Sequence, residues 1–180
     1  KKKKKKFHKV LTNKSKRYIM YIEKKRRYKE MTKMICFDMD GTIADLYGVH
    51  NWLEMLRAED PTPYALAEYM WDMERLAEVL NTLRSVGWEV RIITWLSKDS
   101  TEAYKDEVRK VKREWLEDCG FPFDHFHAVQ YGATKADSIR RYADYAILFD
   151  DNRKVRDGWH MGAAIDPTAI DIIEYLENLI

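Results

Sequence analysis

Short apolar segments alternate with longer amphipathic ones along residues 34–180. This alternation is typical of parallel strands joined by helices. Most of the apolar segments are too continuous for a sheet with one face in water, so we expect each strand to lie between helices. The predicted strands are 34–38, 88–94, 126–129, 146–150 and 160–165, and the predicted helices are 72–85, 97–119, 134–142 and 167–179. The sequence therefore predicts an α/β fold, a Rossmann-like wound parallel sheet with helices on both faces.

The segment 46–69 interrupts this alternation after the first strand, and Asp60-Pro61-Thr62-Pro63 gives it a stiff turn. It is well below the ~50 residues of an independent domain. We predict a small flap or cap insertion with one or two short helices. Its aromatic residues are interpreted as the core of the flap, with stacking on a substrate base as the alternative; they are Trp52, Tyr64, Tyr69 and Trp71.

Charge is divided unevenly along the chain. Residues 1–33 hold 16 of the 32 Lys and Arg but only two of the 30 Asp and Glu, a net charge of +14 that leaves −12 for residues 34–180. This division predicts a basic N-terminal arm, 1–33, attached to an acidic domain, 34–180. The arm would bind nucleic acid through its lysines or attach to an anionic membrane surface. Alternatively it is a solvated tail, or upstream sequence with translation beginning at Met31 or Met34.

Several classes of protein are excluded by composition. No apolar run approaches the roughly 18–20 residues that cross a bilayer, and residues 1–33 lack the apolar stretch and small-residue cleavage site of a signal peptide, so we do not expect secretion. The two cysteines, Cys36 and Cys119, lack the spacing of a zinc site and are too few for a disulfide scaffold. The sequence therefore predicts a cytoplasmic protein with reduced thiols.

The first predicted strand ends in two aspartates, Asp38 and Asp40, followed by Gly41 and Thr42. Residues i and i+2 of a strand share a side, so both carboxylates are predicted to project beyond the carboxyl end of the sheet, where open α/β sheets bind ligands. Gly41 permits a tight turn, and the backbone of Gly41 and Thr42 would approach an anionic oxygen closely.

A second acidic pair, Asp150 and Asp151, closes the apolar run 146–149. If that strand is parallel and adjacent to the first, four carboxylates converge at one edge of the sheet. Such a cluster is costly without a cation, and an all-oxygen ligand set favours Mg²⁺. The sequence therefore predicts a magnesium site.

Four elements in this order resemble the haloacid dehalogenase superfamily of phosphohydrolases, over roughly residues 34–165. The run 38–42 matches the DxDGT signature of the family in full. Thr94 closes the strand 90–93 as the second motif requires, and Lys135 lies at the start of a predicted helix as the third. Asp150 and Asp151 follow an apolar strand as the fourth.

The resemblance implies a role for each of these residues. Asp38 would be the nucleophile that forms an aspartyl-phosphate, and Asp40 the general acid and base. Thr94 and Lys135 would bind the phosphoryl group. Mg²⁺ would be held by Asp38, Asp150, Asp151 through its water shell, and the backbone carbonyl of Asp40.

Other residues compete for some of these roles. Ser97 or Thr101 could replace Thr94, Lys98 or Lys105 could replace Lys135, and Asn152 or Asp157 could replace Asp151 as a ligand. Two histidines, His125 and His127, are interpreted as strand or edge residues because they lack further nitrogen or sulfur partners.

The family's cap domains are inserted after the first motif or between the second and third, and both insertions are short here, so the enzyme is predicted to be nearly capless. An open crevice suits a large substrate, or needs a second subunit in a homo-oligomer to cover a small one. The sequence predicts a Mg²⁺-dependent phosphomonoesterase acting on a nucleotide, as a nucleotidase, or on a nucleic-acid phosphate end. The alternatives are a phosphotransferase or phosphomutase, and a nucleic-acid-binding protein with an inactive phosphatase-like domain.

Overall fold

The computed structural model describes residues 31–180. Of the predicted basic arm, residues 1–30 lie outside the described residues. Residues Thr32–Ile180 form a compact unit, and Lys33 is the first residue of its first strand. No helix within this described unit is long and apolar enough to span a lipid bilayer.

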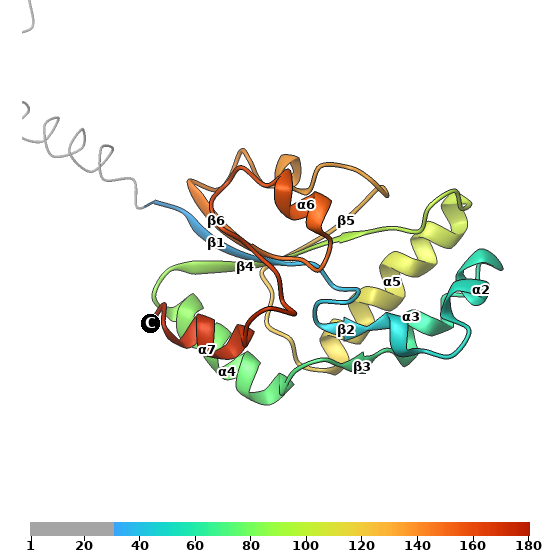
Figure 1. Cartoon of the computed structure of the whole chain (residues 1–180), viewed down its shortest axis with the longest axis horizontal. Helices are drawn as coiled ribbons and strands as arrows, with labels where there is room; N and C mark the ends of the chain where they lie inside the picture. Colours follow the sequence, from blue (N-terminus) through green and yellow to red (C-terminus); the bar gives the residue numbers. More distant parts are fainter. Residues whose placement is uncertain (1–30) are drawn as a thin grey trace, which may run out of the picture. The chain divides into compact units, whose positions relative to one another are not determined.

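The centre of this unit is a parallel sheet in the order β5, β4, β1, β6, β7 (Figure 1). Its strands are β1 (Lys33–Phe37), β4 (Trp88–Trp95), β5 (His125–Val129), β6 (Tyr145–Phe149) and β7 (Ala164–Ile165). The predicted α/β fold with a wound parallel sheet is confirmed. The strand predicted at 160–165 is shorter than expected, because Gly162, with φ +147°, takes the chain out of the extended conformation before Ala164.

Register between the central strands decides where the functional side chains lie. Phe37 of β1 is paired with Ile92 of β4 on one side and with Phe149 of β6 on the other. Strands β1 and β6 therefore end at the same level, and Asp38 and Asp150 both follow at the carboxyl edge. Strand β4 runs on past this level and carries Thr94 two residues further.

Successive residues of the central strands face opposite sides of the sheet, and both sides are covered. One side packs Ile35, Phe37 and Phe149 against α4 (Met73–Ser85), α7 (Ile172–Glu177) and the end of α5 (Glu102–Asp118). The other packs Met34, Cys36 and Leu148 against the region of η2 (Lys135–Ser138) and α6 (Arg153–Asp157). Figure 1 shows α6 on the opposite side of the sheet from α4 and α7.

Capping side chains set where three of the helices begin. The carboxylates of Asp72 and Asp171 accept hydrogen bonds from amides in the first turn of α4 and of α7, and the hydroxyl of Thr101 caps α5. The predicted helices 97–119 and 167–179 therefore start later than apolar spacing alone suggests. The helix predicted at 134–142 is only the 3₁₀ turn η2, because the chain must reverse there: Tyr142 and Ala143 donate back to Ile139, and Asp144 donates to Thr32 beside β1.

Two short helices lie in the segment 46–69, after the 3₁₀ turn η1 (Leu46–Gly48): α2 (Trp52–Arg57) and α3 (Thr62–Leu66). A two-residue strand β3 (Glu68–Tyr69) then pairs antiparallel with β2 (Ala44–Asp45). Tyr64 is buried, as expected for the core of the flap, whereas Tyr69 is exposed and packs edge-on against Trp115 of α5. The segment therefore lies along α5, at the carboxyl edge of the sheet.

Candidate active site

Three carboxylates meet at the carboxyl edge of the sheet. Asp38 follows β1, and Asp150 and Asp151 follow β6, and one oxygen of each lies within 4.8 Å of the others. Asp150 is fully buried and Asp38 nearly so. The structure therefore brings together three of the four carboxylates that the sequence predicts at this edge. The fourth, Asp40, forms an ion pair with Lys112 instead.

Lys135 lies between two of these carboxylates. Its Nζ is 2.8 Å from Oδ1 of Asp38 and 2.7 Å from Oδ2 of Asp150, and its side chain is buried. Burial disfavours the charged ammonium, but the two carboxylates outweigh it and raise the pKa of Lys135. Lys135 is thus a fixed positive charge beside Asp38, where the sequence predicts it.

Crowding changes the acidity of the carboxylates themselves. Burial, followed by the nearby charge of Asp38, raises the pKa of Asp150 to about 7 and that of Asp151 to about 6. Burial also raises the pKa of Asp40, although the ammonium of Lys112 opposes the shift. These carboxylates are therefore costly to ionise together without a further positive charge.

The predicted tight turn is present at Gly41, whose φ is +71°. The amide of Gly41 donates to the carbonyl of Ala44 and the amide of Thr42 to the carbonyl of Met39. Thr42 is fully buried, and its Oγ1 accepts a hydrogen bond of 3.3 Å from the amide of Asp151. Gly41 and Thr42 therefore hold the loop after β1 against the loop after β6.

Sequence reasoning missed one residue of this site, Lys112. Its buried Nζ donates to Oδ2 of Asp40 at 2.6 Å, to Oγ1 of Thr94 at 2.8 Å and to the carbonyl of Trp95 at 2.9 Å. A signal was available, because Lys112 lies four residues from both Val108 and Leu116, on the apolar side of α5. A lysine on the buried face of a helix needs a partner of opposite charge.

The competing side chains lie elsewhere or have other partners. Ser97 bonds the hydroxyl of Tyr64, Thr101 caps α5 and bonds Glu59, and Lys105 pairs with Glu102. Asn152 caps α6, and Asp157 pairs with Arg153. His125 and His127 lie on the edge strand β5, where His127 contacts Arg91. Lys98 lies in the pocket over Asp38 but is exposed, with a side chain that is 66% accessible, and it pairs with Asp99 rather than with a carboxylate of the site.

The residues present fit a divalent cation. If Asp40 and the three clustered carboxylates are all ionised, they exceed the ammonium groups of Lys112 and Lys135 by two negative charges. Oδ1 of Asp38 is buried and, although close to Lys135, accepts no well-directed hydrogen bond from any residue in the described part of the chain. Carboxylate oxygens are the ligands that Mg²⁺ prefers. Asp38, Asp150 and Asp151 would hold it.

A pocket of about 610 Å³ opens over Asp38, Asp40 and Asp151. One wall comes from the segment 46–69 and the other from the loops after β4 and β5. Aromatic side chains line it together with Ser97, Lys98 and Arg57; they are Tyr47, Trp52, Tyr64, Trp95 and Tyr131. The acidic cluster thus lies in a pocket with aromatic walls. Trp52 and Tyr64 belong to these walls, and they are two of the residues for which the sequence predicts either a place in the core of the flap or stacking on a substrate base.

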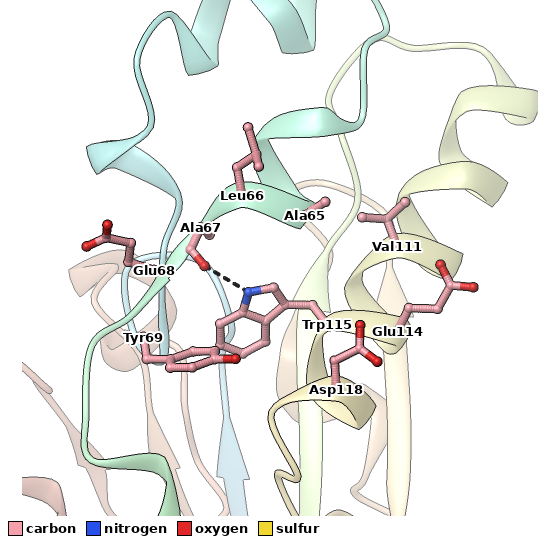
Figure 2. A pocket seen from close by; sticks show the side chains of 9 residues that line it. All are labelled: Ala65, Leu66, Ala67, Glu68, Tyr69, Val111, Glu114, Trp115 and Asp118. Carbon is pink, nitrogen blue, oxygen red and sulfur yellow. Dashed lines mark hydrogen bonds between the residues drawn. The ribbon is translucent and has the colours of Figure 1, made fainter.

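A second hollow, of about 630 Å³, lies between α5 and the segment 65–69 (Figure 2). Its walls are formed by the segment 65–69 and by one face of α5, and it contains none of the predicted site residues. Figure 2 shows the indole of Trp115 donating to the carbonyl of Ala67, at 2.9 Å. The contact ties α5 to the segment that forms a wall of the active-site pocket.

No protein-family model matches the sequence, and no curated protein matches it. Several solved structures are similar to it, and two of them are the following. A D,D-heptose 1,7-bisphosphate phosphatase of Burkholderia thailandensis is 13% identical, with 82% of this chain and 98% of that chain covered and a TM-score of 0.48. A haloacid dehalogenase-like hydrolase of Burkholderia xenovorans LB400 is also 13% identical, with 74% and 83% covered and a TM-score of 0.36. At 13% sequence identity, the similarity to these two structures concerns the backbone alone.

Proposed function

We propose that this protein is a Mg²⁺-dependent phosphomonoesterase that acts through an aspartyl-phosphate on Asp38. The observation that carries the proposal is the position of Asp38, which lines a pocket beside Asp150, Asp151 and the ammonium of Lys135. An ionised carboxylate at the floor of a pocket, next to a fixed positive charge, can attack a phosphorus atom whose negative oxygens would otherwise repel it.

The reaction then takes two displacements. In the first, an oxygen of Asp38 bonds to phosphorus, the ester P–O bond breaks, and Asp40 gives its proton to the leaving oxygen. In the second, Asp40 takes a proton from water as the water oxygen bonds to phosphorus, the bond to Asp38 breaks and inorganic phosphate leaves. A bound Mg²⁺ would offset negative charge on the phosphoryl oxygens. Lys135 stabilises the same charge from the protein side.

The walls of the pocket favour a substrate with a planar group. Five aromatic side chains surround the acidic floor, and the rings of Trp95 and Tyr131 contact each other at an angle of 49°, with centroids 4.9 Å apart. Nucleic-acid bases stack on such side chains whatever their identity. We therefore propose a nucleoside monophosphate or a nucleic-acid phosphate end as the substrate, and a cytoplasmic place of action, where such substrates occur.

Asp38→Asn tests the proposal, because it keeps the shape of the side chain and removes the nucleophile. Phosphate release from 4-nitrophenyl phosphate and from a panel of nucleotides is measured with Mg²⁺ and with EDTA. We expect the variant to lose at least about a thousandfold in turnover, as removal of a covalent nucleophile does. Asp106→Asn, an exposed carboxylate on α5, is the matched control and keeps full activity.

Unchanged turnover in Asp38→Asn would remove Asp38 as nucleophile. If transfer to added alcohols rises as phosphate release falls, the protein is a phosphotransferase. A wild-type protein without turnover but with salt-sensitive nucleic-acid binding would be a binding protein that retains a phosphatase-like fold.

A further inference from the structure

Lys112 is the buried charge whose purpose the reaction above leaves open. Its side chain has no exposed surface, yet it extends from α5 to the edge of the active site. Lysine is almost never buried unless it is paired. All three hydrogens of the ammonium are used, on Oδ2 of Asp40, Oγ1 of Thr94 and the carbonyl of Trp95.

The helix that carries Lys112 is held in place on both sides of it. Trp115 donates to Ala67, as Figure 2 shows, and the hydroxyl of Tyr104 donates to the carbonyl of Asp60 at 3.0 Å. Val108 and Leu116, one turn to either side of Lys112, are fully buried. The ring of Tyr64 lies 4.7 Å from Nζ and covers the ammonium. The position of Nζ is therefore fixed by the fold.

The two buried lysines of the site serve different carboxylates. Lys135 contacts Asp38 and Asp150, which belong to the acidic cluster. Lys112 contacts Asp40 alone among the carboxylates in the described residues, and Asp40 is not a member of that cluster. Of the two oxygens of Asp40, Oδ2 is taken by Lys112, and Oδ1 accepts no hydrogen bond from residues 31–180.

We propose that Lys112 is a positioning residue that holds the Asp40 carboxylate by Oδ2, so that Oδ1 is presented to the leaving oxygen and then to water. The inference rests on the proposed function, in which Asp40 is the general acid and base. Asp40 lines the pocket and Lys112 does not, so Lys112 acts through Asp40 without touching the substrate. The ammonium keeps its three hydrogens throughout, and the proton that moves belongs to Asp40.

A positioned acid matters most where the leaving group needs a proton. An alkoxide leaving group, as from glycerol 2-phosphate, must be protonated as it departs, whereas 4-nitrophenolate departs with little help. The constant kcat/KM reports the steps up to departure of the leaving group, before water enters. Poor positioning of Asp40 therefore lowers kcat/KM for the alkyl ester more than it lowers kcat/KM for the aryl ester.

The experiment compares wild type, Lys112→Met, Asp40→Asn and the double variant on both esters with Mg²⁺. We expect Lys112→Met to lose about 100-fold in kcat/KM on glycerol 2-phosphate and about tenfold or less on 4-nitrophenyl phosphate, within the 10²–10⁴-fold range of general acid catalysis. KM should change by less than about threefold, because substrate is not contacted. Lys110→Met, an exposed position on the same helix, is the matched control and keeps wild-type values.

In the Asp40→Asn background, removing Lys112 should cost less than about threefold on either ester, since Lys112 has no acid left to position. This comparison remains possible if Lys112→Met alone does not fold. In the double variant, asparagine replaces the carboxylate of Asp40, so the loss of Lys112 leaves no unpaired charge. Equal losses on the two esters, or losses that multiply in the double variant, would overturn the inference and leave the proposed function intact. A wild-type protein that hydrolyses neither ester would overturn both.

Discussion

Gly41 and Asp151 approach so closely that a Cβ atom on Gly41 would lie 2.7 Å from Oδ2 of Asp151. The same atom would lie 2.6 Å from Cε2 of Tyr47. The glycine of the DxDGT run is therefore required twice, once for a left-handed backbone with φ +71° and once for the space that a carboxylate of the acidic cluster occupies.

Gly41→Ala should therefore harm both stability and turnover. We expect a loss of about 2 to 4 kcal/mol in the free energy of unfolding, from left-handed strain and overpacking together, and at least a tenfold loss of kcat as Asp151 is displaced. Gly120→Ala is the matched control, since Gly120 has φ +69° but open space around it. It should cost only the strain, about 1 to 2 kcal/mol, with unchanged kcat. If urea denaturation showed the same loss in free energy of unfolding for the two variants, Asp151 would have moved away from the new Cβ atom with little loss of stability.

The raised pKa of Asp150, about 7, predicts how stability depends on pH in the absence of metal. A carboxyl whose pKa is higher in the folded than in the unfolded state stabilises the fold while protonated, and this contribution is lost as pH rises through the folded pKa. In EDTA, Asp150→Asn should therefore gain on wild type between pH 4 and pH 7, by on the order of 2 kcal/mol in the free energy of unfolding.

The difference in free energy of unfolding between wild type and Asp150→Asn reports on Asp150. Carboxylates with lowered pKa elsewhere, such as Asp124 and Asp166, have the opposite effect on the pH dependence of stability, but they are present in both proteins. Added Mg²⁺ should stabilise wild type more at pH 7.5 than at pH 5 and should leave Asp150→Asn nearly unchanged. Thermal unfolding in EDTA and in Mg²⁺ at the two pH values provides the measurement. An equal effect of Mg²⁺ on both proteins would place its binding away from Asp150.

Tyr131→Leu tests the stacking proposed for the substrate. Tyr131 is exposed and lines the pocket, so its replacement should scarcely affect stability. We expect KM for the best nucleoside monophosphate to rise about tenfold, since stacking on one aromatic contributes about 1 to 3 kcal/mol, while KM for glycerol 2-phosphate stays the same. Tyr142→Leu, similarly exposed but outside the pocket, is the control. A rise in KM for both substrates would argue against base stacking.

Removal of residues 1–30 tests the proposed role of the basic arm. Lys33 belongs to β1 and must be kept, so the deletion ends earlier than the basic segment does. Hydrolysis of 4-nitrophenyl phosphate should be unchanged, whereas affinity for a single-stranded oligonucleotide should fall and depend less steeply on salt, because fewer counterions are released. Titrations of fluorescent oligonucleotide at several salt concentrations measure both. An unchanged salt slope would show that the arm does not bind the phosphate backbone.

The sequence predicts the elements that follow from local pattern. Asp38 and Asp150 end apolar strands, and parallel pairing with β1 in the middle brings the two ends to one level, as expected. Capping chemistry explains α4, where Asp72 precedes an amphipathic stretch.

Long-range contacts determine what the sequence does not predict. The helix expected at 134–142 is limited to one turn because Asp144 must return to Thr32 at the start of the sheet. The partners of Lys112 are also set by long-range contacts. Its spacing from Val108 and Leu116 predicts that it lies on the buried face of α5, but the sequence of α5 does not predict that it bonds Asp40 and Thr94. Those partners are set by the packing of α5 on the edge of the sheet.

The central place of β1 between β4 and β6 has a consequence for synthesis of the chain. Asp38 is translated well before the loop that follows β6, which joins it from far downstream, as in the bond between Asp151 and Thr42, which are 109 residues apart. A nascent chain that has not yet released β6 from the ribosome exposes one edge of β1 and lacks two of its three clustered carboxylates. The acidic cluster is therefore complete only after β6 and the loop that follows it have left the exit tunnel.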